Sequence, residues 1–332
     1  MKSKVVCLRP KHDFDRANIT IPESFEIHFF PKFEEEVVAQ ASADAEFILS
    51  PSHSPHLSAR FIARAKALKL IQLCGSGYDA VDLEAADRAG IPVARSPGQN
   101  SRAVAEYSYN LINVLNRGIL VGDLETKKGN YQWVRDNLRK EGLYELGDMN
   151  LGILGVGPVG KEMAKICGFF GAKLFYYDII RLSPEAEKEL KLTFVEFSEL
   201  LRISDILSLH IPINEKTKGI IGRKELAAMK PSAVLINTAR GALVDDEALV
   251  EALRANRLRG AAIDVFEPEP MPPDHLFLSV GPEVQKKLVL TPHLAGAARQ
   301  SQNRMFQEAI HNILRVIRGE PPKHVVNLNQ AP

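Results

Sequence analysis

The chain has 332 residues, a formal net charge of +1, and 45% hydrophobic and 25% charged residues. This length is enough for two ordinary domains, and this composition is typical of a folded globular protein. The nearly balanced charge gives no sign of a nucleic-acid or membrane-surface partner. No apolar run reaches the roughly 18 residues that a membrane span needs, and the first residues lack the apolar core of a signal peptide.

Three cysteines, Cys7, Cys74 and Cys167, are widely spaced and form no C-x-x-C pair. An odd and sparse set is typical of a reducing compartment rather than of a disulfide framework. We therefore expect three packed core thiols in a cytoplasmic protein, and we expect no metal site.

Short apolar runs alternate with helical patterns along most of the chain, which predicts an α/β fold with parallel sheets. In the first hundred residues the expected strands are 5–8, 25–29, 47–49 and 70–73, and the expected helices are 33–41 and 58–67. A stronger series begins at Asn150, with expected strands at 151–154, 173–177, 206–210, 233–237, 260–263 and 288–290.

Two further helical patterns flank the stronger series, at about 103–120 and 300–318. A polar stretch to Asp148 separates the first of them from the strands, and its Trp133 is expected to be a packing anchor. One organisation fits this order: residues 1–101 and 295–332 form one domain, and residues 102–294 are inserted as a second domain.

A glycine-rich turn follows the strand expected at 151–154. Gly155, Gly157 and Gly160 form G-x-G-x-x-G between this strand and a helix expected from about Val159 to Phe169. In this context the first glycine allows a tight turn, the second lets the backbone approach a pyrophosphate, and the third lets helix and strand pack closely. The N–H groups at the helix start would then hold the phosphate charge.

Asp178 ends the next expected strand, 18 positions after Gly160. An acid at about this distance accepts hydrogen bonds from the adenine ribose of a dinucleotide, and it would repel a 2′-phosphate. The sequence therefore favours NAD over NADP. Arg181 leaves the alternative open, because an arginine in this region can accommodate the phosphate.

Three polar residues follow expected strands at the carboxyl edge where open α/β sheets bind ligands. They are Arg240, Glu269 and His293. A lone residue of each type is usually structural or solvated, but three at one edge predict a catalytic site. Reduction of a keto acid needs a proton donor, which a carboxylate-supported histidine supplies, and a guanidinium matches a substrate carboxylate.

These features resemble the D-isomer-specific 2-hydroxyacid dehydrogenase family, whose members include phosphoglycerate, glycerate/hydroxypyruvate and D-lactate dehydrogenases. The resemblance spans about residues 45–320 and implies a flavodoxin-like substrate domain, built from both chain ends, with an inserted doubly wound NAD-binding domain. The matching strings are 75–83, 90–93, 96–100, 103–106, 155–160, 237–241, 264–270 and 291–293.

The resemblance implies a role for each matching residue. His293 is implied as the general acid/base, Glu269 as its carboxylate partner, and Arg240 as the group that binds the substrate carboxylate and polarises the carbonyl. Backbone N–H groups of Gly75, Ser76 and Gly77 are implied to hold the same carboxylate. Besides the three glycines and Asp178, the implied cofactor contacts are Pro158, Val159, His210, Pro212, Thr217, Thr238, Ala239, Asp264 and Gly296.

The resemblance also implies a homodimer that pairs through the region of 103–120 and 131–144, which is richer in apolar and aromatic residues than a solvated linker. The expected activity is hydride transfer between NAD and a small 2-hydroxy or 2-keto acid, with D specificity. Formate dehydrogenases of the superfamily carry glutamine where Glu269 stands, which disfavours that activity. Two alternatives stay open: a dinucleotide-sensing corepressor-like protein, and a phosphite-type dehydrogenase.

Overall fold

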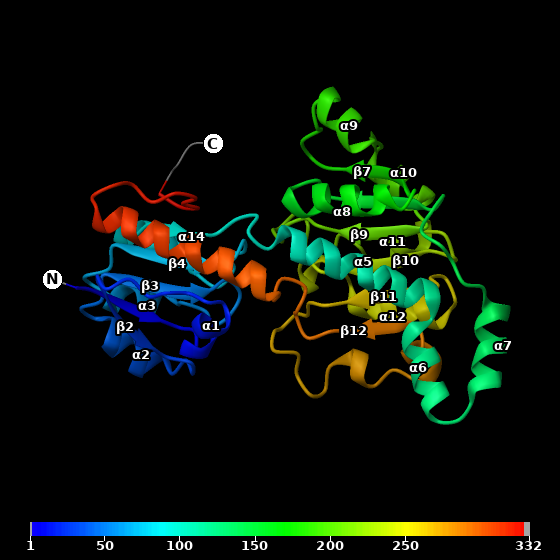
Figure 1. The fold of residues 1–332 in the computed structure, drawn as a ribbon, viewed down its shortest axis with the longest axis horizontal. Coiled ribbons are helices and arrows are strands. Elements are labelled where there is room, and N and C mark those ends of the chain that lie inside the picture. Colours follow the sequence, from blue (N-terminus) through cyan, green and yellow to red (C-terminus); the bar gives the residue numbers. More distant parts are fainter. Residues whose placement is uncertain (1, 329–332) are drawn as a thin grey trace. The chain divides into compact units, whose positions relative to one another are not determined.

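The computed structural model describes residues 2–328 and divides into two compact units (Figure 1). The first unit contains the described residues up to Asn100 and those from Ala297 onward, and the second contains Ser101–Gly296. Each unit is a parallel sheet covered by helices, so the predicted α/β class is confirmed. No helix among residues 2–328 is both long and apolar enough to cross a bilayer.

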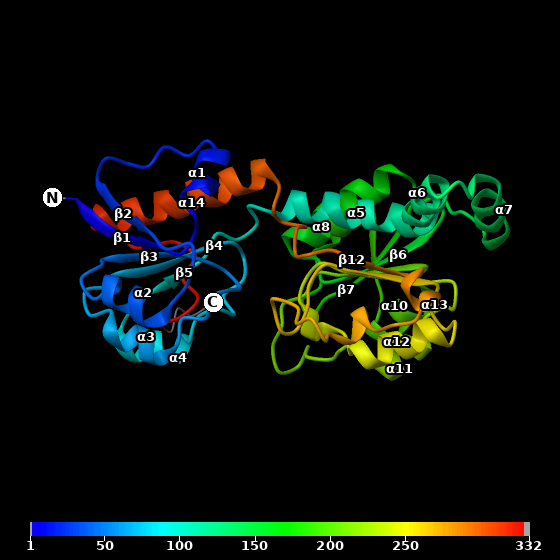
Figure 2. The same cartoon turned by 90° about the horizontal axis from the view of Figure 1, so that it is seen from below.

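The first unit is a five-stranded parallel sheet of order β2-β1-β3-β4-β5, the order of a flavodoxin-like fold. Helices α1 and α14 cover one face, and α2, α3 and α4 cover the other (Figure 2). Its strands are β1 Ser3–Cys7, β2 Phe25–Phe29, β3 Phe47–Pro51, β4 Leu70–Cys74 and β5 Val93–Ala94. Its helices are α1 Lys11–Arg16, α2 Glu35–Ser42, α3 Ala59–Arg64, α4 Leu83–Ala89 and α14 Arg299–Ile317.

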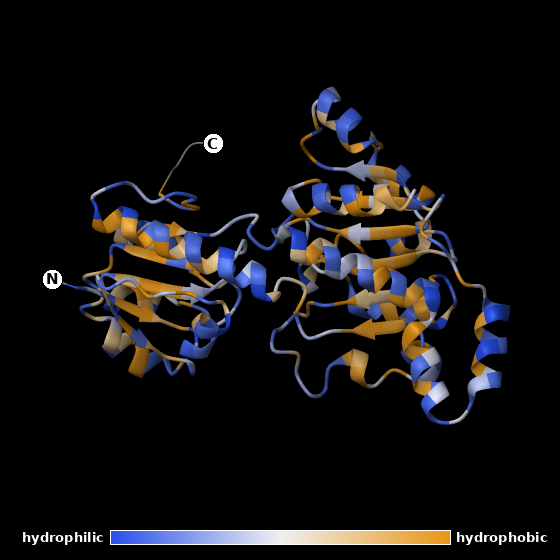
Figure 3. Ribbon diagram, in the orientation of Figure 1, coloured by the Kyte–Doolittle hydropathy of each residue, from blue (hydrophilic) through white to orange (hydrophobic). Residues whose placement is uncertain are grey.

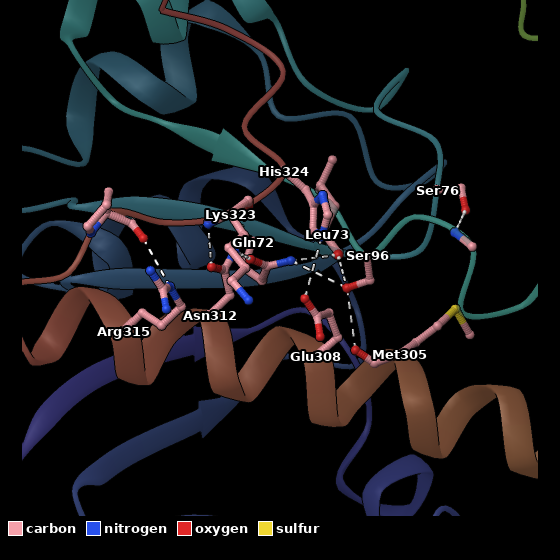
Figure 4. Close-up of polar contacts among 12 residues, drawn as sticks. Gln72, Leu73, Ser76, Ser96, Met305, Glu308, Asn312, Arg315, Lys323 and His324 are labelled. Atoms are coloured by element: carbon pink, nitrogen blue, oxygen red, sulfur yellow. Dashed lines mark hydrogen bonds and ion pairs between the residues drawn. The ribbon is translucent and has the colours of Figure 1, made fainter. Parts of the chain in front are cut away.

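A buried polar network connects the carboxyl-terminal helix α14 to strand β4 (Figure 4). Asn312 donates from Nδ2 to Oε1 of Gln72 at 2.6 Å, and its Oδ1 accepts from the backbone N–H of Lys323 at 2.7 Å. Ser96 donates to the carbonyl oxygen of Leu73 at 3.2 Å. Buried polar groups are costly unless paired, so this network specifies how the chain end packs in this unit.

The second unit is a seven-stranded parallel sheet of order β12-β11-β10-β9-β6-β7-β8. Its chain order reverses between β6 and β9, which is where doubly wound folds bind a dinucleotide. Its strands are β6 Asn150–Leu154, β7 Lys173–Tyr177, β8 Leu192–Phe194, β9 Ile206–Leu209, β10 Val234–Asn237, β11 Gly260–Ile263 and β12 Leu288–Leu290. Its helices are α5 Ser101–Arg117, α6 Ile119–Lys127, α7 Tyr131–Glu141, α8 Pro158–Phe169, α9 Pro184–Leu190, α10 Phe197–Ile203, α11 Arg223–Ala228, α12 Asp246–Arg254 and α13 Pro282–Gln285.

The inner strands of the second unit, β6 and β9 to β11, are mostly apolar and buried because helices cover both faces of the sheet (Figure 3). Helices α5 and α8 pack on one face, and α10, α11 and α12 pack on the other (Figure 2). Two layers of helices on one parallel sheet are the doubly wound architecture that the resemblance implies.

The polar stretch between α5 and β6, for which the sequence predicts no helix, forms helices α6 and α7. Trp133 lies on α7 and is 55% exposed. The expectation that it anchors packing within the chain is therefore wrong. Many residues of α7 are charged, and Val134 is its one buried residue. The helix therefore lacks the apolar periodicity by which a helix is predicted from sequence.

The cysteines are free and buried, which confirms the expectation of packed thiols. Burial raises the pKa of Cys74 and of Cys167 to about 12. Desolvation also raises the pKa of Cys7. A thiol reacts as its thiolate, so all three are unreactive near neutral pH.

Candidate active site

The glycine turn after β6 requires glycine at two positions for steric reasons. Gly155 has φ +94°, and a Cβ there would lie 2.8 Å from the carbonyl oxygen of His210. A Cβ on Gly160 would lie 2.2 Å from the carbonyl oxygen of Gly155. A Cβ on Gly157, by contrast, would have no atom within 4 Å. The backbone at Gly155 and at Gly160 is therefore packed tightly against protein atoms, whereas the backbone at Gly157 faces open space.

Helix α8 begins at this open side with Pro158. The first N–H groups of a helix have no partner within it, and they lie at the positive end of the helix dipole. Here Val159 and Gly160 supply such groups, and Gly157 places no side chain in front of them. The geometry fits the pyrophosphate of a dinucleotide.

Asp178 lies directly after β7 and is tied to the same turn. Its Oδ2 accepts from the backbone N–H of Val156 at 2.8 Å, and its Oδ1 accepts from that of Ile180 at 3.3 Å. The carboxylate is partly exposed. These contacts fix its direction while leaving acceptor capacity for ribose hydroxyls, because a carboxylate offers about four lone-pair sites.

The loop after β9 contains His210, Pro212 and Thr217. His210 Nε2 lies 2.9 Å from the hydroxyl of Ser208, and desolvation lowers the pKa of His210 to about 3. The imidazole is therefore neutral at physiological pH. The hydroxyl of Thr217 donates to the carbonyl oxygen of Pro212 at 2.8 Å, so it holds the loop together at the strand end nearest Gly155.

The Arg240 turn is organised by two buried residues, Asn237 and Ser108, to which the sequence analysis assigns no individual role. Asn237 accepts from the N–H of Ala239 at 3.1 Å and donates to the carbonyl oxygen of Arg240 at 2.8 Å. Ser108 on α5 lies 2.8 Å from Oγ1 of Thr238, hydroxyl to hydroxyl. An asparagine at a strand end is a turn signal that predicts the first role, whereas no sequence signal predicts the second.

Asp264 follows β11 and is fully buried. Its carboxylate accepts from the hydroxyl of Thr291 at 2.5 Å and from the N–H groups of Leu294 and Ala295 at 3.0 and 2.9 Å. Its backbone carbonyl accepts from the N–H of His293 at 2.8 Å. Asp264 therefore holds the loop in which His293 adopts a left-handed backbone, with φ 52°.

Glu269 is clamped at both oxygens. Oε1 accepts from the N–H of Phe266 at 2.8 Å, and Oε2 lies 2.7 Å from Nδ1 of His293. The side chains of Glu269 and His293 stay partly exposed, at 19% and 29%. This arrangement orients the imidazole, and Nε2 is the ring nitrogen on the side away from Glu269.

The Arg240 turn and the Glu269 turn pack against each other. A Cβ on Gly241 would lie 2.2 Å from the carbonyl carbon of Phe266, so only glycine allows this approach. The structure thus brings together Arg240, Glu269 and His293 at the ends of adjacent strands β10, β11 and β12. It places the glycine turn and Asp178 after β6 and β7 of the same sheet.

The loop of Gly75, Ser76 and Gly77 belongs to the first unit and follows β4. Gly75 has φ +155°, and a Cβ there would lie 2.5 Å from Oγ of Ser52. Arg95 donates to the carbonyl oxygen of Ser76 at 2.8 Å, and the Gly75 carbonyl accepts from the N–H of Ser96 at 2.8 Å. The loop is therefore held by the segment after β5.

Comparison with known proteins agrees with this geometry. The model of the D-isomer specific 2-hydroxyacid dehydrogenase family, NAD binding domain, matches residues 110–295. Glyoxylate reductase of Aeropyrum pernix is 36% identical over 90% of this chain and 87% of its own length, and that of Thermococcus litoralis is 37% identical over 80% and 79%. The holo structure of Rhodotorula graminis D-mandelate dehydrogenase is 27% identical, with a TM-score of 0.84 over 100% of this chain and 99% of that chain.

The fold and the site define an NAD-dependent α/β oxidoreductase. The chain belongs to the D-isomer-specific 2-hydroxyacid dehydrogenase family. It transfers hydride between NAD and a 2-hydroxy or 2-keto acid. The corepressor-like and phosphite-type alternatives are not favoured, because these relatives are named as reductases and dehydrogenases.

Proposed function

We propose that the chain reduces a small 2-keto acid of the glyoxylate type and that His293 donates the proton. The observation that carries the proposal is the 2.7 Å contact between Glu269 Oε2 and His293 Nδ1. Since Glu269 holds one ring nitrogen, the other is oriented toward a reacting oxygen. Relatives named glyoxylate reductase support the choice of substrate.

The proposed roles of His293, Glu269 and Arg240 follow from the charges of the substrate and of these side chains. Reduction places negative charge on the carbonyl oxygen, and a proton from His293 Nε2 neutralises it. The Glu269 carboxylate lies 2.7 Å from Nδ1 of the same ring and so fixes the orientation of the imidazole. Bound NADH supplies the hydride, and the protein supplies orientation. Arg240 binds the substrate carboxylate, because a guanidinium matches a planar carboxylate with paired hydrogen bonds.

We propose that the first unit supplies backbone hydrogen-bond donors for the substrate. N–H groups of Gly75, Ser76 and Gly77 bind the substrate carboxylate, and the clamp by Arg95 and Ser96 supports a fixed loop. Fixed donors lose little entropy when a ligand binds. We therefore propose that this unit is the substrate-binding domain and that the second unit is the NAD-binding domain.

The cofactor is held by the glycine turn and its neighbours. Gly155, Gly157, Pro158, Val159 and Gly160 bind the pyrophosphate, and Asp178 accepts from the adenine ribose. The remaining proposed contacts are His210, Pro212, Thr217, Thr238, Ala239, Asp264 and Gly296. The carboxylate of Asp178 would repel a 2′-phosphate, so we propose a preference for NADH over NADPH.

The test of the proposed substrate is NADH oxidation by the purified protein with glyoxylate, hydroxypyruvate, pyruvate and phenylpyruvate. We expect the highest kcat/KM with glyoxylate or hydroxypyruvate, and the D isomer wherever the product is chiral. Preference for phenylpyruvate, or turnover of none of the four, would contradict the proposed substrate class.

We further propose a homodimer that pairs through the region of 103–120 and 131–144, which forms α5, the start of α6, and α7. These helices expose apolar side chains that the chain itself leaves uncovered, a pattern typical of an interaction surface. The exposed side chains are Ile119 (49%), Leu120 (52%), Leu124 (55%), Tyr131 (58%) and Trp133 (55%). A second copy is the proposed partner because the family pairs through this region.

A cytoplasmic location is proposed from the three buried free thiols, because proteins of reducing compartments keep unpaired cysteines. Fractionation of the source cells with an antibody against the protein is the test. Recovery with the membrane or secreted fraction would contradict it.

A further inference from the structure

Arg181 follows Asp178 by three residues, but its guanidinium is bound elsewhere. Its Nε donates to Oε1 of Glu187 at 2.8 Å, and its Nη2 donates to Oε2 at 3.1 Å. Its Cζ lies 5.0 Å from the centre of the Phe194 ring. A bidentate ion pair and a ring face together fix a planar cation more firmly than a single contact does.

Glu187 is held in place by the sheet. The hydroxyl of Tyr176, a fully buried residue of β7, donates to Oε1 of Glu187 at 2.6 Å. The same hydroxyl accepts from the N–H of Leu182 at 3.0 Å. The Glu187 side chain is only 14% exposed, whereas that of Arg181 is 62% exposed. The carboxylate is therefore the fixed member of the pair, and the arginine is the member that would move if the pair were broken.

Glu187 lies in the first turn of α9, which packs at the edge of the sheet near β7 (Figure 1). Its contacts with Tyr176 and Arg181 thus place its negative charge beside the cation nearest to Asp178 in the chain. An arginine in this region is the group that accommodates a 2′-phosphate in NADP-dependent folds. Here the cation that could neutralise such a phosphate is already neutralised.

We propose that Glu187 is a specificity-determining residue that excludes NADPH by retaining Arg181. The inference rests on the proposed NADH preference and adds a second cause to it. Asp178 repels the 2′-phosphate, and Glu187 withholds the counter-charge that would offset this repulsion. Loss of the Glu187 charge therefore strengthens binding of 2′-phosphorylated ligands and leaves unphosphorylated ligands unaffected.

The experiment compares two ligands that bind without reacting, ADP-ribose and 2′-phospho-ADP-ribose, by isothermal titration calorimetry. Glu187→Gln removes the charge but keeps an oxygen for the Tyr176 hydroxyl. We expect 2′-phospho-ADP-ribose to bind roughly three- to tenfold more tightly, the range that a partly exposed pair supports. We expect the affinity for ADP-ribose to stay within about twofold, and kcat/KM with NADPH to rise by the same factor as the calorimetric gain.

Two further variants separate the release of Arg181 from a change in charge alone. In the double variant Arg181→Gln/Glu187→Gln, the gain should vanish, because the released cation is gone. Glu185→Gln is the matched control, since Glu185 lies in the same first turn of α9 but has no ion pair with Arg181. We expect this control to bind both ligands as the wild type does.

Two results would overturn the proposal: an unchanged ligand ratio in Glu187→Gln, or a gain that persists in the double variant. Arg181→Gln alone gives a test that does not depend on the folding of any Glu187 variant. In that variant a retained arginine predicts unchanged ADP-ribose affinity and at most about a threefold loss of 2′-phospho-ADP-ribose affinity, the effect of the uncompensated Glu187 carboxylate. A larger selective loss would overturn the proposal. Asp178→Asn tests the proposed NADH preference separately: a gain there with none in Glu187→Gln rejects the role of Glu187 alone.

Discussion

Oε2 of Glu269 lies 2.7 Å from Nδ1 of His293, while Oε1 of the same carboxylate accepts from the backbone N–H of Phe266. One side chain therefore supports the imidazole and is itself supported by the loop that follows β11. Asp264 at the start of that loop holds the His293 loop through four hydrogen bonds, which its side chain and its backbone carbonyl accept. Two sets of contacts therefore fix the orientation of His293: Glu269 contacts its ring, and Asp264 accepts from its backbone N–H.

Glu269→Gln should lower kcat for keto-acid reduction by at least about tenfold. Glutamine has one acceptor oxygen, so it cannot serve both Phe266 N–H and His293 Nδ1–H, and it cannot stabilise an imidazolium by charge. Steady-state kinetics with NADH and glyoxylate measure the effect. Glu267→Gln, an exposed neighbour in the same turn, should retain wild-type turnover; equal loss in both variants would refute the specific role of Glu269.

Gly160→Ala and Gly157→Ala should separate folding from cofactor binding. A Cβ at Gly160 would lie 2.2 Å from a backbone oxygen, so this variant should lose NADH affinity and also lower Tm. A Cβ at Gly157 meets nothing within 4 Å and should lower NADH affinity by about tenfold or more at unchanged Tm, because it fills the space proposed for the pyrophosphate. Normal NADH binding by Gly157→Ala would show that the cofactor lies elsewhere.

Asp246 gives a pH-dependent contribution to stability. Burial raises its pKa from 3.8 to about 6, with His275 opposing the shift, and its Oδ2 lies 3.3 Å from Nε2 of His275. Because the pKa is raised, the folded state holds this proton more tightly than the unfolded chain does between about pH 4 and 6. The wild type therefore gains stability from this group as the pH falls through 6, and loses it as the pH rises.

Asp246→Asn removes this titration. Relative to the variant, the wild type should gain on the order of 1 kcal/mol between pH 7 and pH 4.5, a figure that allows for the partial exposure of the carboxylate. Differential scanning calorimetry across this range should show Tm of the wild type rising relative to Tm of Asp246→Asn as the pH falls. A constant difference in Tm would mean that Asp246 titrates normally in the folded protein.

The exposed face of α6 and α7 predicts the oligomeric state. Light scattering on a sizing column should give twice the chain mass of 36.8 kDa for the wild type. Trp133→Glu places a charge where the proposed partner packs and should yield a monomer. Ile179→Ser, which changes an equally apolar residue that is 89% exposed elsewhere, should remain dimeric; a wild-type monomer at micromolar concentration would exclude the proposed dimer.

The sequence predicts most of the second unit, because its inner strands are buried on both faces and appear as apolar runs. The runs at β6 and β9 are examples. The turn sequences after β10, β11 and β12 also predict the catalytic edge, since adjacent parallel strands end side by side. The two-residue strand β5 is too short to produce a periodic pattern.

Other features depend on tertiary contacts that no pattern contains. Trp133 is exposed because it lies on the face of α7 that does not pack against the rest of the chain. The many charged residues of α7 leave no apolar periodicity that would predict which face is buried. The ion pair between Glu187 and Arg181 forms only because the first turn of α9 packs next to β7. The contact between Ser108 and Thr238 joins residues 130 positions apart. Such pairs become visible only when packing is known.

The most direct test of the account compares the wild type with His293→Ala in reduction of glyoxylate by NADH, together with NADH binding by fluorescence titration. Because His293 is the proposed proton donor, kcat should fall about 10²-fold or more. The Kd for NADH should stay within about twofold, since the glycine turn and Asp178 are unchanged. Wild-type turnover in His293→Ala would contradict the central claim that this imidazole, held by Glu269, performs the proton transfer.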